Sequence, residues 1–194
     1  MQKPSLYRKV DYDVDLINSI IERIKNEGLR PEDWTICFDM DNTLAIFSYF
    51  GNDDEALKKA NRKGFYRNLQ CFEEAPAVIE TLQKIGFKVK ILSVYLDTKY
   101  CKDEKIAWIE YHLPTVGKED IILVPKGDKK TDYIEDIKHT ILVDDYYGNL
   151  MTWMEEGGLA IKKTFSGKPR PIPQVINLTE IFKILYDLGL LNNK

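Results

Sequence analysis

The sequence predicts an α/β fold in which a parallel sheet carries helices on both of its faces. Three observations lead to this prediction. Short apolar runs alternate with segments of helical periodicity along most of the 194-residue chain. The apolar runs do not alternate with polar residues, which is typical of strands buried on both faces. Several of them end at an acidic or hydroxyl side chain, as strands do where a parallel sheet binds its ligand.

The elements follow from these patterns in order. A first helix is predicted over 14–28, because leucine and isoleucine recur at helical spacing and Gly28 can end it. Five short apolar runs are predicted as strands: 34–38, 88–92, 120–124, 140–143 and 159–162. Four later segments are predicted as helices: 76–85, 103–111, 149–156 and 178–190. Pro76 suits the first turn of its helix, and Gly86 its end.

The segment 46–72 shows no clear strand, and its polar middle part favours helix. It leaves the sheet where the first strand ends, so we expect it to form a small helical cap over that edge. The remaining parts, 1–45 and 73–194, are predicted to form one α/β core.

Composition excludes several classes of protein. The 28 Lys and Arg residues against 31 Asp and Glu give a net charge of −3, which argues against a nucleic acid polymer as partner. No apolar run approaches the roughly 20 residues of a membrane helix, so no membrane partner is expected. The start of the chain lacks the pattern of a secretory signal, and the three cysteines show no CxxC spacing. We therefore expect a cytoplasmic protein without disulfides.

The clearest motif follows the first predicted strand. Asp39 and Asp41 are two residues apart, so on extended backbone both side chains face one space, while Met40 turns into the core. Two carboxylates so close repel each other unless a cation lies between them. A second acidic pair, Asp144-Asp145, ends a later strand at the same edge. Carboxylates and carbonyls in this combination predict a Mg²⁺ site.

The same edge offers groups that could bind phosphate. Ser93 follows the second strand and can donate to a phosphate oxygen. A lysine can neutralise phosphate charge, and three compete for this role: Lys126, Lys129 and Lys130. We favour Lys130, with Lys129 as the alternative, because Lys130 opens a turn that leads to the Asp144 strand.

Together these groups predict phosphoryl transfer from a small phosphomonoester through an aspartyl-phosphate. Asp39 would be the nucleophile. Asp41 would protonate the leaving oxygen and then activate water.

The residues Asp39-Met40-Asp41-Asn42-Thr43, Ser93, a downstream lysine and Asp144-Asp145 resemble, in this order, the four motifs of the haloacid dehalogenase (HAD) superfamily. The resemblance spans about residues 34–150. It implies a Rossmann-like fold, Mg²⁺ and phosphatase activity. It also implies that the Asp39 carboxylate, the Asp41 backbone carbonyl and Asp144 hold the metal, with Asp145 just outside these ligands.

A narrower resemblance is to the 5′(3′)-deoxyribonucleotidases. It is carried by the first motif with Leu44-Ala45 and Phe47, by Gly64-Phe65-Tyr66 and Leu69, and by 75–86. It implies a 5′-nucleotidase acting on (deoxy)ribonucleoside monophosphates, with Phe47 stacking on the base and Thr43 also binding substrate. The sequence departs from that family at three places: Asn42-Thr43 (usually Gly-Val), Ile46 (usually acidic) and Ser93-Val94-Tyr95 (usually Thr-Ser-Pro).

Two other functions remain open at this point. One is a HAD phosphatase of a non-nucleotide metabolite, since the aromatic residues of the cap could receive a sugar or a lipid-like tail in place of a base. The other is a receiver-like signalling domain that is phosphorylated on aspartate but is no catalyst. Receivers, however, carry their acidic pair early in the chain, whereas here the pair comes last. The sequence does not predict the oligomeric state.

Overall fold

The computed structural model describes residues 22, 26, 28–48, 53–165 and 171–191. The helix predicted over 14–28 lies almost wholly outside the described residues. Six parallel strands form the main sheet in the order β5-β4-β1-β6-β7-β8. Their bounds are β1 (Thr35–Phe38), β4 (Lys88–Tyr95), β5 (Ile121–Pro125), β6 (Thr140–Asp144), β7 (Leu159–Lys163) and β8 (Gln174–Val175). The α/β prediction is confirmed, and β8 is an addition to it.

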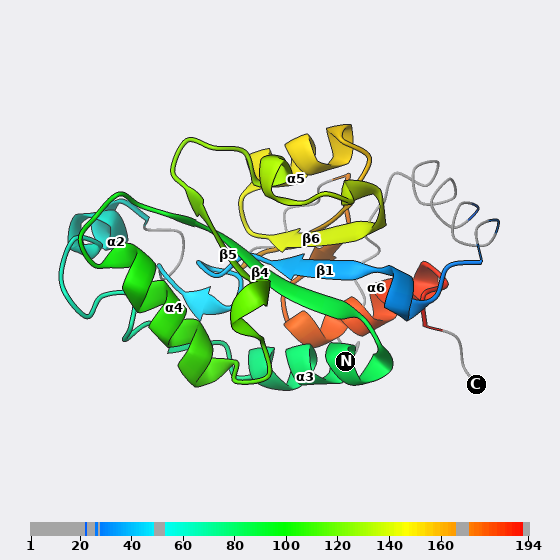
Figure 1. Ribbon diagram of the computed structural model, residues 1–194, viewed down its shortest axis with the longest axis horizontal. Helices are drawn as coiled ribbons and strands as arrows, with labels where there is room; N and C mark the ends of the chain where they lie inside the picture. Colours follow the sequence, from blue (N-terminus) through cyan, green and yellow to red (C-terminus); the bar gives the residue numbers. More distant parts are fainter. Residues whose placement is uncertain (1–21, 23–25, 27, 49–52, 166–170, 192–194) are drawn as a thin grey trace, which may run out of the picture.

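Helices cover both faces of this sheet, with α5 on one side and α3, α4 and α6 on the other (Figure 1). The helices are α2 (Asp53–Lys59), α3 (Ala75–Ile85), α4 (Cys101–His112), α5 (Tyr147–Glu155) and α6 (Ile181–Asp187). None of these helices combines the length and the hydrophobicity needed to span a bilayer. The last predicted helix begins as a short 3-10 turn, η5 (Leu178–Glu180).

The two layers of the core follow the alternation of side chains along the strands. In β1, Ile36 and Phe38 belong to the larger apolar cluster, on the side of α3 and α6. Cys37 between them belongs to the smaller cluster, together with Trp153 of α5. These three side chains of β1 are fully buried, which explains why this part of the strand is apolar without interruption.

Helix α3 shows how local sequence sets the element bounds. Pro76 lies in its first turn, where a missing N–H costs nothing. Gly86 ends the helix at φ 119°, and its N–H donates to the carbonyls of Leu82 and Gln83. Val78, Ile79 and Leu82 lie buried on its inner face.

The cap contains a feature that the sequence did not predict. β2 (Ala45–Ile46) pairs in antiparallel fashion with β3 (Gln70–Cys71), so the two ends of the inserted segment form a small second sheet. The sequence shows no clear strand in this segment, so these two short strands are an addition to the predicted helical cap. Two residues on each side are too few to give a recognisable strand pattern, and the pairing closes the insert where it leaves and rejoins the core.

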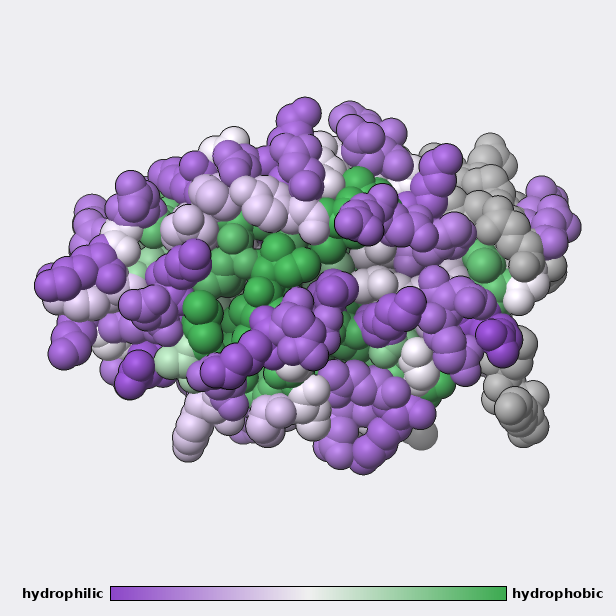
Figure 2. Space-filling model, in the orientation of Figure 1, coloured by the Kyte–Doolittle hydropathy of each residue, from purple (hydrophilic) through white to green (hydrophobic). Residues whose placement is uncertain are grey.

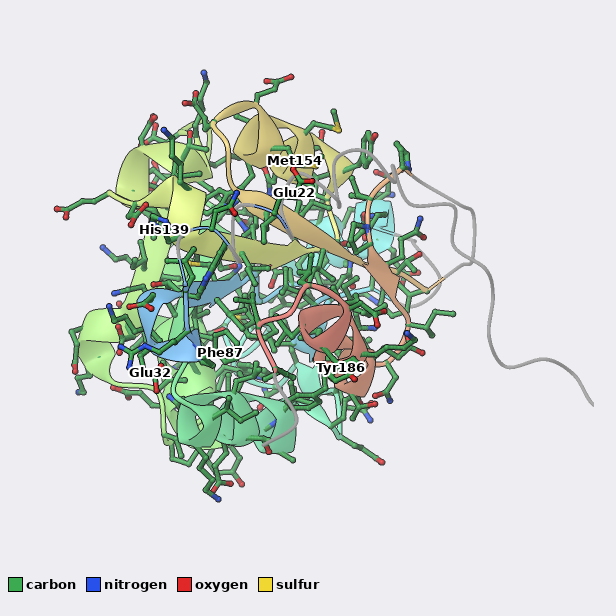
Figure 3. The ribbon with its side chains drawn as sticks, turned by 90° about the vertical axis from the view of Figure 1, so that its right-hand side faces the viewer. Glu22, Glu32, Phe87, His139, Met154 and Tyr186 are labelled. Carbon is green, nitrogen blue, oxygen red and sulfur yellow. The ribbon has the colours of Figure 1, made fainter. Side chains whose placement is uncertain are left out.

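In the view of Figure 2 the molecule is largely hydrophilic around a central hydrophobic area over β4 and the edge strand β5. Figure 3 faces the amino ends of the strands, where Glu32, Phe87 and His139 each lie just before a strand. The acidic motifs come at the opposite, carboxyl end of the sheet.

Candidate active site

The two acidic motifs lie side by side because β1 and β6 are neighbours in the sheet. Asp39 directly follows β1, and its backbone N–H donates to the carbonyl of Val143 in β6 at 2.9 Å. Asp144 is the last residue of β6. Parallel pairing thus brings together carboxylates that lie far apart in the sequence, at the edge where such sheets bind ligands.

Three carboxylates form a compact cluster. Asp39, Asp144 and Asp145 each offer one oxygen atom, and these oxygens all lie within 4.8 Å of one another. Burial, together with Asp144 and Asp39 nearby, raises the pKa of Asp145 to about 8. Such a donor set fits a hard divalent cation, because oxygen ligands suit it and its charge would offset their repulsion.

Lys130 partly neutralises this cluster. Its Nζ donates to Asp39 Oδ1 at 2.6 Å and to Asp144 Oδ2 at 2.7 Å, and the residue is only 4% exposed. Burial alone would lower the pKa of Lys130, but Asp144 and Asp39 outweigh burial and raise it. Lys130 therefore stays charged, whereas Lys126 and Lys129 are exposed to solvent.

Further hydrogen bonds orient Asp144. Its Oδ1 accepts from the backbone N–H of Tyr146 at 2.7 Å, and its Oδ2 accepts from Asn149 at 2.9 Å. Both donors belong to the start of α5. Asn149 was not predicted as a site residue, although it lies in the first turn of a helix that begins just beyond the acidic pair.

Asp41 is held by a different cation. Lys105 of α4 donates to Asp41 Oδ2 at 2.7 Å and to the Ser93 hydroxyl at 3.0 Å. Burial raises the pKa of Asp41, with Lys105 opposing and Asp39 adding to the effect. The second oxygen of Asp41, Oδ1, is buried and has no hydrogen-bond partner among the described residues.

Lys105 was not predicted as a site residue. A lysine in a helix is usually solvent-exposed, yet Lys105 is fully buried and its neighbour Glu104 is 6% exposed. Its position in the helix could have indicated this burial. Lys105 lies four residues after Cys101 and three before Trp108, and both of those residues are buried too. This spacing puts Lys105 on the inner face of α4.

Ser93 also differs from its predicted setting. It was expected just beyond a strand ending at Leu92, but β4 continues to Tyr95 and Ser93 lies within it, fully buried. Strand pairing with β5 extends to Tyr95, opposite Pro125, and this explains the longer strand.

Asn42 links the first motif to the cap. It adopts a left-handed conformation (φ 58°), which asparagine tolerates better than most residues. Its Nδ2 donates to Ser48 Oγ and to Asp53 Oδ1, both at 3.4 Å, and its Oδ1 accepts from the Ser48 N–H at 3.0 Å. Thr43, the next residue, is fully buried, and its hydroxyl has no partner in the described part of the chain.

Phe47 lies in an aromatic cluster of the cap. Its ring meets Phe65 edge-on at 5.5 Å and stacks with Tyr66 at 6.2 Å. A cavity of about 510 Å³ has Phe47 and Phe65 in its wall, along with residues of α2. Thus Asp39, Asp144, Asp145 and Lys130 form one group, and Asp41 with Ser93 and Lys105 a second. Phe47 lies apart from both, in the cap.

Solved structures share this fold. A dehalogenase structure superposes with a TM-score of 0.57 at 18% identity, covering 78% of this chain and 96% of its own. A HAD family hydrolase from Deinococcus radiodurans, with bound phosphate and sodium, superposes with a TM-score of 0.56 at 13% identity, covering 86% of this chain and 100% of its own. A HAD hydrolase of family IA, variant 3, from Entamoeba histolytica superposes with a TM-score of 0.58 at 14% identity, covering 80% of this chain and 99% of its own. Comparison with curated proteins gave no match.

The fold is therefore that of the HAD hydrolases. The family model described as 5′ nucleotidase, deoxy (Pyrimidine), cytosolic type C protein matches residues 17–161, and the chain belongs to this family. The match spans most of the described core and the cap. The protein is accordingly a phosphatase of HAD type.

Proposed function

We propose that the protein hydrolyses nucleoside 5′-monophosphates in two steps, with Asp39 as the nucleophile. The observation that supports this most directly is the arrangement of Asp39 beside Lys130 and the carboxylate cluster, with Asp41 on a separate ion pair. A nucleophile and an acid/base are then held in different electrostatic settings. Such a difference lets two carboxyl groups take different roles.

In the first step, an Asp39 oxygen attacks phosphorus and the bond from phosphorus to the nucleoside oxygen breaks. Asp41 gives its proton to that oxygen. The raised pKa of Asp41 supports this assignment, because an acid must hold its proton until the transition state. In the second step Asp41 takes a proton from water, whose oxygen attacks phosphorus and releases phosphate and Asp39.

Two groups would contact the phosphoryl group directly. The Lys130 ammonium already touches the nucleophile, so it can balance the charge gathered on the phosphoryl oxygens. Ser93 can donate its hydroxyl proton to one of them, since its oxygen already accepts from Lys105.

The residues present also suit Mg²⁺. The Asp39 and Asp144 carboxylates and the Asp41 backbone carbonyl would hold it, with Asp145 within reach. When bound, the ion would neutralise phosphate charge and orient the substrate. The nucleotide assignment draws on the family match and on the aromatic cluster around Phe47, where a flat base could stack.

The test is phosphate release from a panel of 5′- and 3′-nucleotides and sugar phosphates, with and without Mg²⁺. Asp39→Asn should fold normally and lose activity, whereas Asp54→Asn, at an exposed position of α2, should retain it. Preference for sugar phosphates would refute the nucleotide assignment. Activity in Asp39→Asn would refute the mechanism.

A further inference from the structure

The Lys105 side chain has no exposed surface, and its charge is balanced by an ion pair with Asp41. Its Nζ makes three hydrogen bonds, to Asp41 Oδ2 at 2.7 Å, to Ser93 Oγ at 3.0 Å and to the Val94 carbonyl at 2.7 Å. A lysine ammonium has three N–H donors. All three are used, so the ammonium is fixed in direction and has no donor left for a substrate.

This geometry also fixes Asp41. One carboxylate oxygen, Oδ2, is held by Lys105, while Oδ1 is buried and lacks a partner in the described structure. Lys105 therefore sets the direction of the Asp41 carboxyl group, because the oxygen that it holds is the one with a hydrogen bond in the described structure. Without Lys105, the Asp41 carboxyl group could rotate about χ1 and χ2, and either oxygen could leave the position that faces the phosphoryl group.

Helix α4 holds the cap as well as Asp41. Glu104 accepts from the backbone N–H groups of Gly64 at 2.5 Å and Tyr66 at 3.2 Å. Trp108 donates to the Leu69 carbonyl at 2.7 Å. The Lys105 ammonium lies 5.4 Å from the centre of the Tyr66 ring, so it is enclosed between the cap and the edge of the sheet.

We propose that Lys105 is a positioning residue for the reaction: it orients Asp41 for proton transfer and Ser93 for phosphate binding, and it does so through contacts that couple them to α4. The proposal rests on the proposed function, because it assigns Asp41 the role of acid and base. It assigns Lys105 no contact with substrate.

The leaving group provides a readout that a merely structural role would not change. p-Nitrophenolate leaves readily without protonation, whereas the oxygen of a nucleoside needs a proton from Asp41 to leave. The parameter is kcat/KM, because it reports the steps up to departure of the leaving group. Lys105→Met should lower kcat/KM for thymidine 5′-monophosphate by about 100-fold and for p-nitrophenyl phosphate by roughly tenfold or less.

The matched control is Lys102→Met, an exposed lysine of the same helix, which should leave both values near those of the wild type. Equal losses on the two substrates in Lys105→Met would overturn the proposal, and so would no loss on thymidine 5′-monophosphate. If the wild type hydrolyses neither substrate, the proposed function fails instead, so the two failures are distinguishable.

A double variant keeps the test available if Lys105→Met does not fold, because Asp41→Asn with Lys105→Met leaves no buried charge unpaired in this contact. If Lys105 acts only through Asp41 and Ser93, the double variant should hydrolyse p-nitrophenyl phosphate with no more than the roughly tenfold loss expected through Ser93, relative to Asp41→Asn alone. A further fall well beyond tenfold would mean that Lys105 acts through groups other than Asp41 and Ser93, and would overturn the proposal.

Discussion

Lys130 is the residue whose loss should most affect the stability of the site. Its ammonium is bonded to Asp39 and Asp144 at 2.6 and 2.7 Å, and its side chain is 2% exposed. Replacing it with methionine removes the cation and leaves both carboxylates buried beside Asp145. Breaking a buried ion pair from one side is costly because the remaining charge keeps its desolvation penalty.

We expect Lys130→Met to lower the free energy of unfolding by about 3–5 kcal/mol in metal-free protein. This corresponds to an unfolding equilibrium shifted by roughly 150- to 5,000-fold. With a urea dependence of about 2 kcal/mol/M, the midpoint should fall by about 2 M. Mg²⁺ should reduce the difference in free energy of unfolding between the variant and the wild type, because a cation among the three carboxylates would replace the missing positive charge. At a hundredfold excess of Mg²⁺ over its Kd, binding would contribute about 2.7 kcal/mol to the free energy of unfolding.

The assay is urea denaturation followed by tryptophan fluorescence, with EDTA or with millimolar Mg²⁺. Lys129→Met is the control, because it removes an exposed lysine one residue away. The reasoning is refuted if Lys130→Met is as stable as Lys129→Met without metal. It is also refuted if Mg²⁺ stabilises Lys130→Met no more than the wild type.

Two further outcomes follow from the structure. The pKa of Asp145 is raised to about 8 from an unfolded value near 4, so its protonated form favours the fold. Metal-free protein should therefore lose thermal stability as pH rises from 5 to 8.5, and Asp145→Asn should flatten that profile; a profile unchanged by Asp145→Asn would contradict this. Glu104→Ala should expose segment 60–69 to trypsin without global unfolding, because Gly64 and Tyr66 lose their acceptor; Glu110→Ala on the same helix should not, and equal cleavage of both would contradict the coupling.

Much of the fold could be predicted from sequence because its signals are local. Continuous apolar runs such as 140–143 identify strands buried on both faces, and the residues that end them identify the functional edge. The cluster of Asp39, Asp144 and Asp145 follows from that topology, and Lys130 was the favoured lysine. The carboxylate cluster is a consequence of the parallel order, which needs no knowledge of side-chain packing, whereas Lys130 was favoured for its place in a turn before the Asp144 strand.

The remaining features depend on contacts between distant segments. β2 and β3 are two residues long and exist only because the two ends of the cap meet. Ser93 lies inside β4 because β5 pairs beyond it. Lys105 resembles any helical lysine until the fold places Asp41 against it. Each of these features is decided by a partner that the local sequence does not contain.

The two lysines change how the acidic composition should be interpreted. A net charge of −3 suggests a surface that repels phosphate, yet Asp39, Asp41 and Asp144 are paired with buried cations from outside the main sheet. Lys130 comes from η3 (Lys130–Tyr133) and Lys105 from α4. The two carboxylates with proposed catalytic roles therefore have separate cations: Lys130 lies beside the nucleophile Asp39, and Lys105 lies beside the acid Asp41. Since the cations reside on separate elements, a change in α4 should disturb proton transfer while leaving the Asp39 cluster intact, whereas a change in η3 should disturb the Asp39 cluster first.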